Sequence, residues 1–127
     1  MNKYTVTSVF GMIGAFSWSG TVLLRETIVN DFNIFNDILG IMPNISACWV
    51  FIWIGEKLVN KTNNSFNFKL ASIISAVIFL LAIASEIVHE MFLSSSFDVN
   101  DIIATVLAIF VYLISFYISK CKMVIKK

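Results

Sequence analysis

The sequence predicts an all-α membrane protein with four transmembrane helices. Its 127 residues are 58% hydrophobic and have a mean hydropathy of +0.86, which is too apolar for a soluble domain of this size. Apolar runs of about 20 residues, the length that crosses a bilayer as a helix, recur along the chain. Short polar stretches separate these runs and hold most of the charges. Together these features predict one four-helix transmembrane domain over residues 1–127.

Four apolar segments have the length of a membrane span. They are predicted at about residues 4–24, 38–57, 70–93 and 102–119. The first stays uncharged for a full span before it meets Arg25, so we expect an uncleaved helix rather than a signal peptide. The connection between the second and third segments is short and polar, as expected for a turn outside the membrane.

Charge placement predicts the orientation of the four helices. In a four-pass chain one side receives Lys3, Lys57, Lys61, Lys69, Lys120, Lys122, Lys126 and Lys127, and the other receives Arg25, Glu26, Asp31, Asp37, Glu86, Glu90, Asp98 and Asp101. Only Glu56 among the acids falls on the lysine side. Because lysine-rich ends stay in the cytoplasm, we expect a multi-pass cell-membrane protein with both termini inside. An interfacial helix or loop is expected on the outer surface from Glu26 to Asp37.

The second segment contains a proline, Pro43, followed by Asn44. Proline lacks a backbone N–H and clashes with the preceding turn, so it either kinks a helix or starts one. If Pro43 starts the helix, residues 37–42 form an interfacial stretch. Asn44 then lies near the outer surface, on the same side as the acids, and we assign Pro43 and Asn44 structural roles.

The stretch from Glu86 to Asp101 concentrates the ionisable groups. It holds four of the eight acidic residues and the only histidine, His89. Helical spacing puts Glu86 and His89 on one face. Asp98 suits the N-cap of the fourth helix, with Asp101 in its first turn. The few residues between the third and fourth segments predict a tight outer hairpin.

We therefore take Glu86, His89, Asp98 and Asp101 as candidates for a polar binding site. Glu86 lies about 10 Å along its helix from Leu93, deep enough that a carboxylate needs a proton, a donor or a polar cavity. Helix capping is the structural alternative for the two aspartates. Metal binding by Glu86 and His89, which have the i, i+3 spacing of helical iron and manganese sites, is a weaker alternative because the chain has only one such motif. No cofactor is expected.

The same residues resemble a known signature. Glu86-Ile-Val-His89 and the run from Ser96 to Ile103, SFDVNDII, are similar to the C-terminal signature of the VanZ-like membrane protein family: a Glu and a Gln three apart on the third helix, a basic loop residue, then Phe-Asp-x-x-Asp. The run from Asp37 to Pro43 is similar to the apolar motif of that family. The resemblance implies a four-helix integral membrane protein of the cell envelope, named for resistance to glycopeptides such as teicoplanin.

The chain departs from this signature at four positions. His89 stands where the family usually has Gln, and Ser95 stands where it usually has Arg; Thr105 and Ala108 replace an Asn and a Gly. Without the loop arginine, the acids lose a neutralising cation. We expect His89 to replace it in part by pairing with Glu86 or with an aspartate across the hairpin.

The favoured function is therefore non-enzymatic. We expect an outward-facing polar pocket that binds a glycopeptide, a lipid head group or a partner membrane protein, with membrane lipids around it. The net charge of +1, without a basic stripe, excludes a nucleic-acid partner. The alternative is a membrane-embedded, metal-dependent enzyme acting on a lipid-linked substrate. An ion or proton path through Glu86 ranks last, because the inner halves of the third and fourth segments offer few polar residues.

Overall fold

The chain forms four helices in the computed structural model, which describes residues 5–27, 33–93 and 96–125, leaving out the side chains of residues 26–27, 33–36 and 122–125. The helices are α1 (Val6–Thr27), α2 (Asn33–Lys61), α3 (Phe68–Leu93) and α4 (Val99–Ile125). Each contains a stretch long and apolar enough to cross a membrane. The all-α prediction with four candidate spans is confirmed.

Helices α1 and α4 begin where polar side chains cap them. Thr5 Oγ1 accepts the N–H of Ser8 at 3.1 Å at the start of α1, and Asp98 Oδ1 accepts the N–H of Asn100 at 2.9 Å at the start of α4. Such caps satisfy N–H groups that lack a partner within the helix. Helices α2 and α4 run beyond their predicted bounds, because apolarity marks only the part that can face lipid, whereas the helix continues into polar sequence.

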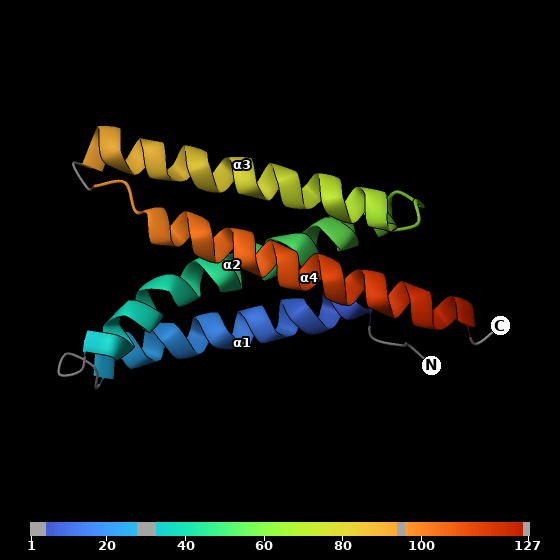
Figure 1. The fold of residues 1–127 in the computed structure, drawn as a ribbon, viewed down its shortest axis with the longest axis horizontal. Helices are drawn as coiled ribbons and strands as arrows, with labels where there is room; N and C mark the ends of the chain where they lie inside the picture. The colour runs from blue at the N-terminus through green and yellow to red at the C-terminus, as the bar shows by residue number, and fades with distance from the viewer. Residues whose placement is uncertain (1–4, 28–32, 94–95, 126–127) are drawn as a thin grey trace.

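The four helices run up and down along one long axis (Figure 1). The start of α1, the end of α4 and the connection between α2 and α3 lie at one end, which we call the terminal end. The last turns of α1 and α3 and the first turns of α2 and α4 lie at the other, which we call the hairpin end. Neighbours in the sequence are therefore antiparallel.

Helices α2 and α4 form the centre of the bundle. They contact each other and both outer helices, whereas the described parts of α1 and α3 do not touch each other. Helix α3 is the least enclosed by its neighbours. Only 11% of its most apolar stretch is buried, against 28% of the corresponding stretch in α1 and in α4. A helix this apolar, with most of its surface open, suits a lipid environment.

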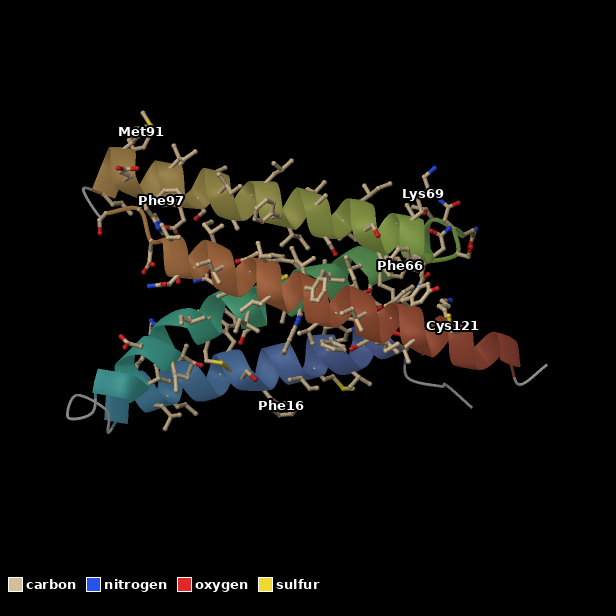
Figure 2. The ribbon with its side chains drawn as sticks, in the orientation of Figure 1. Phe16, Phe66, Lys69, Met91, Phe97 and Cys121 are labelled. Carbon is tan, nitrogen blue, oxygen red and sulfur yellow. The ribbon has the colours of Figure 1, made fainter. Side chains whose placement is uncertain are left out.

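The outer surface of this bundle is largely apolar, and polar residues are buried between the helices alongside an apolar core. Large apolar side chains point outward, such as Phe16 on α1 and Met91 on α3, which are 78% and 72% exposed (Figure 2). The buried polar and charged residues are Thr7, Ser8, Thr21, Ser46, Glu56, Ser75, Glu86 and Thr105. Apolar groups outside and polar groups inside are the arrangement that a bilayer favours. Together with four helices long and apolar enough to span a bilayer, this distribution indicates a multi-pass membrane protein.

The centre of the bundle is held by aromatic packing and close helix contact. The fully buried Tyr112 of α4 lies edge-on to Phe10 of α1, with ring centroids 5.6 Å apart, and near Phe116, at 5.9 Å. Trp49 of α2 donates its indole N–H to the carbonyl of Ala108 at 3.0 Å. Cys48 is buried in the same core and Cys121 is exposed; both are free thiols.

Candidate functional site

A polar cluster at the hairpin end draws one or more residues from each helix. Its members are Arg25 of α1, Asn44 of α2, Glu86 of α3, Asp98 immediately before α4, and Asp101 of α4, and we call them the hairpin-end cluster. Three of the four predicted binding residues, Glu86, Asp98 and Asp101, are thus brought together. Asn44 joins them, although only a structural role is predicted for it from the sequence.

Glu86 is the buried member of the cluster. Its side chain is 9% exposed, although the neighbouring residues on α3, from Ile87 to Leu93, are exposed. One carboxylate oxygen, Oε2, accepts the backbone N–H of Asp98 at 3.2 Å. That N–H immediately precedes α4, where the helix dipole favours a negative charge. Glu86 therefore ties α3 to the start of α4 and faces the interior rather than lipid.

Both aspartates lie at the start of α4, as predicted. Asp98 is the N-cap, and Asp101 is the acidic residue of the first turn. Asp101 is half-buried: its carboxylate hydrogen-bonds the side chain of Asn44 and interacts electrostatically with Asp98, Glu86 and Arg25. Helix capping is a sufficient structural reason for an aspartate at position 98. It does not explain why the Asp101 side chain interacts with Arg25 of α1 and Asn44 of α2.

Arg25 supplies the positive charge of the cluster, and Pro43 accounts for the position of its guanidinium. Pro43 has no N–H to donate to the carbonyl four residues earlier, which belongs to Leu39. The Arg25 guanidinium donates to that carbonyl at 2.7 Å. A carbonyl freed by proline on α2 is thus satisfied by α1. The same arginine acts on Asp101 through its charge.

Pro43 lies inside α2, ten residues after its first residue, so the alternative in which Pro43 starts the helix is wrong. The helix tolerates the proline because Arg25 donates to the carbonyl left without a partner.

The interfacial stretch expected from Glu26 to Asp37 is also corrected in part. Its first two residues belong to α1 and its last five to α2, while residues 28–32 lie outside the described residues.

His89 does not join the cluster. Its side chain is exposed and, among the described residues, makes no hydrogen bond or ion pair, so the pairing predicted with Glu86 or an aspartate is absent. The physical reason is that Glu86 turns toward α4, where it accepts the Asp98 N–H, while His89 stays on the open side of α3. Glu90 is exposed as well. Ser95, the departure that suggested a role for His89, lies outside the described residues.

The described residues contain no group of three or more His, Cys, Asp or Glu side chains arranged to hold a metal. Glu86 and His89, the weak metal candidates, diverge as just described. The hairpin-end cluster offers carboxylates, an amide and a guanidinium. These groups suit electrostatic recognition of a charged or hydrogen-bonding ligand better than they suit covalent catalysis.

Two functional candidates escaped the sequence prediction. From the sequence, Arg25 marks only the end of a span, although a proline that frees a carbonyl on a neighbouring helix signals the need for a donor. The sequence places Glu56 only on the lysine-rich side of the membrane, yet its side chain is 3% exposed and accepts a hydrogen bond from the Thr5 hydroxyl. Which face of a helix points inward cannot be deduced where the helix is apolar all round.

No model of a protein family, no curated protein and no solved structure matches this chain.

Proposed function

We propose that this chain is a divergent VanZ-like protein of the cell envelope that binds an amine-bearing ligand at the hairpin-end cluster. The ligand would be a glycopeptide of the teicoplanin type or a lipid head group with an ammonium group. Such binding would contribute to glycopeptide resistance without catalysis. The observation that carries this proposal is the excess of acid among the described residues at this end of the bundle: Asp101 interacts electrostatically with two other carboxylates, Glu86 and Asp98, and with one guanidinium, Arg25.

The charges within the cluster support a cationic ligand. Arg25 already donates to the Leu39 carbonyl, so its guanidinium is shared between that oxygen and Asp101. Glu86 is nearly buried and receives one backbone hydrogen bond. Carboxylates held near an apolar phase favour a positive group that neutralises them. An ammonium group supplies that charge and three N–H donors.

The spacing of the signature residues also supports the VanZ-like assignment. Glu86 and Asp98 stand twelve positions apart in the sequence and meet through the hydrogen bond between them. The proposed orientation has both termini in the cytoplasm. It rests on Lys57, Lys61, Lys69 and Lys120, which belong to the terminal end, since lysines accumulate on the cytoplasmic side. The hairpin-end cluster would then face the cell exterior.

Glu86→Gln tests the proposed function, because it removes the buried charge while keeping the size and one acceptor oxygen. Expressed in a glycopeptide-susceptible host, the wild-type chain should raise the inhibitory concentration of teicoplanin, and Glu86→Gln should return it to the empty-vector value. Teicoplanin binding to the purified protein should weaken at least tenfold, since loss of one partner in a buried charge pair costs about 2 kcal/mol or more.

Glu90→Gln is the matched control. It removes the same charge from the same helix, but the side chain is exposed and lies outside the cluster. Its resistance and binding should equal those of the wild type. Equal drug profiles for Glu86→Gln and the wild type, at equal protein levels, would reject the proposal.

A further inference from the structure

The surface of the terminal end is rich in lysine and poor in exposed acid. Every lysine whose side chain the structure describes belongs to this end and is exposed: Lys57, Lys61, Lys69 and Lys120 (Figure 1). The described acid of this end, Glu56, is only 3% exposed and accepts the Thr5 hydroxyl. Residues 1–4 and 122–127 bring further lysines and no Asp or Glu. The excess of positive charge therefore does not depend on side chains that the structure leaves out.

Two of these lysines contact aromatic rings. Lys57 Nζ lies 5.9 Å from the ring centroid of Trp53 on α2, and Lys120 Nζ lies 5.5 Å from that of Phe116 on α4. A cation within about 6 Å of a ring centroid is attracted by the face of the ring. Such a contact restricts an ammonium group to one place and leaves its outer side open. We call Lys57 and Lys120 the ring-contacting lysines.

An exposed apolar surface adjoins each ring-contacting lysine. Ile54, three residues before Lys57, is 44% exposed, and Tyr117, three residues before Lys120, is 59% exposed. Residues three apart share a face of a helix. Both helices end shortly after the lysine, so Ile54 and Tyr117 lie on the side of the lysine toward the middle of the span. Each lysine is thus an exposed positive group at the border of an apolar surface.

We propose that the ring-contacting lysines bind the phosphate groups of anionic phospholipids. A phospholipid joins a phosphate to acyl chains, which matches a positive group next to an exposed apolar surface. A lysine ammonium is a compact charge with three N–H donors for phosphate oxygens. A lysine close to the membrane surface strengthens the binding of anionic lipid about fivefold. A soluble anion or an acidic protein would leave the adjoining apolar surface unused. The function proposed above does not use these lysines.

Lipid selectivity of the full chain tests this site. The protein is reconstituted in phosphatidylcholine vesicles that contain a trace of spin-labelled lipid, and electron spin resonance measures the fraction of label held by the protein. At a salt concentration of about 0.15 M, phosphatidylglycerol should associate about twofold or more above phosphatidylcholine. The double variant Lys57→Gln, Lys120→Gln should lose most of this preference. Both side chains are exposed, so the variant should fold normally.

The double variant Lys61→Gln, Lys69→Gln is the matched control. It removes the same charge from the same end, but these two lysines show no ring contact among the described residues. It should keep most of the preference for phosphatidylglycerol. Equal losses in the two double variants would overturn the ring-contacting site, because they would mean attraction by net charge alone. A wild type without preference for phosphatidylglycerol would also overturn it, as would displacement of the labelled lipid by an equal concentration of soluble glycerol phosphate.

Discussion

Tyr112→Ala should unfold the bundle more readily than any other single truncation of its core. The side chain is fully buried, contacts Phe10 and Phe116, and joins α4 to α1 through Thr7. Truncation of a buried aromatic residue costs about 3–5 kcal/mol in soluble proteins. The lower figure applies here because lipid, unlike water, does not penalise apolar groups. The measurement is unfolding of the purified protein by increasing SDS, followed by tryptophan fluorescence.

Tyr112→Phe separates the ring from the hydroxyl. It should cost only about 1 kcal/mol, because it leaves the Thr7 hydroxyl buried without its partner. The double variant Tyr112→Phe, Thr7→Val removes both partners and should recover most of that loss. If Tyr112→Ala and Tyr112→Phe proved equally stable, the ring would not be part of the core.

Gly14→Ala should force α1 and α2 apart. A Cβ added at Gly14 would lie 2.8 Å from the backbone oxygen of Ser46 and 3.2–3.3 Å from side-chain atoms of Val50 and Trp49. A backbone oxygen cannot rotate away, so the helices themselves must move. Overpacking of this kind costs about 1–3 kcal/mol, and a larger residue such as valine should cost more. The SDS unfolding assay described above measures it.

Gly20→Ala provides the comparison on the same helix. A Cβ at Gly20 meets no atom within 4 Å, so this variant should be as stable as the wild type or more stable, since alanine favours helix. Destabilisation of equal size at both positions would mean that the α1–α2 contact is not the close packing described.

The hydropathy pattern predicts the number and type of helices because lipid imposes a length on every span. It does not predict how the helices pack. Helix α3 shows why: it is apolar on every side, so its few buried residues, such as Ala71 and Ser75, leave no periodic signal in the sequence. The predicted bounds of α2 and α4 are too short for a related reason: both helices continue into polar sequence beyond their apolar runs.

The candidate site was half predictable. Scarcity of charge pointed to Glu86, Asp98 and Asp101, because an ionisable residue in an apolar segment needs a reason to be there. The predicted pairing of His89 with Glu86 is wrong because i, i+3 spacing permits this contact but does not require it. Glu86 accepts the Asp98 N–H instead. The role of Arg25 could not be predicted from the sequence. It depends on the Leu39 carbonyl, which Pro43 leaves without a partner, and on the packing of α1 against α2.

Accessibility of single cysteines tests most directly the central claim, that this is a four-span membrane protein with its hairpin end outside the cell. Two variants suffice. The single variant Cys48→Ala keeps only the exposed Cys121. The triple variant Cys48→Ala, Cys121→Ser, Ser96→Cys places its one thiol at an exposed residue of the hairpin end. With a membrane-impermeant maleimide, the Ser96→Cys variant should react in intact cells, and Cys121 only after permeabilisation. Reaction of Cys121 in intact cells, or protection of the Ser96→Cys thiol, would contradict the account.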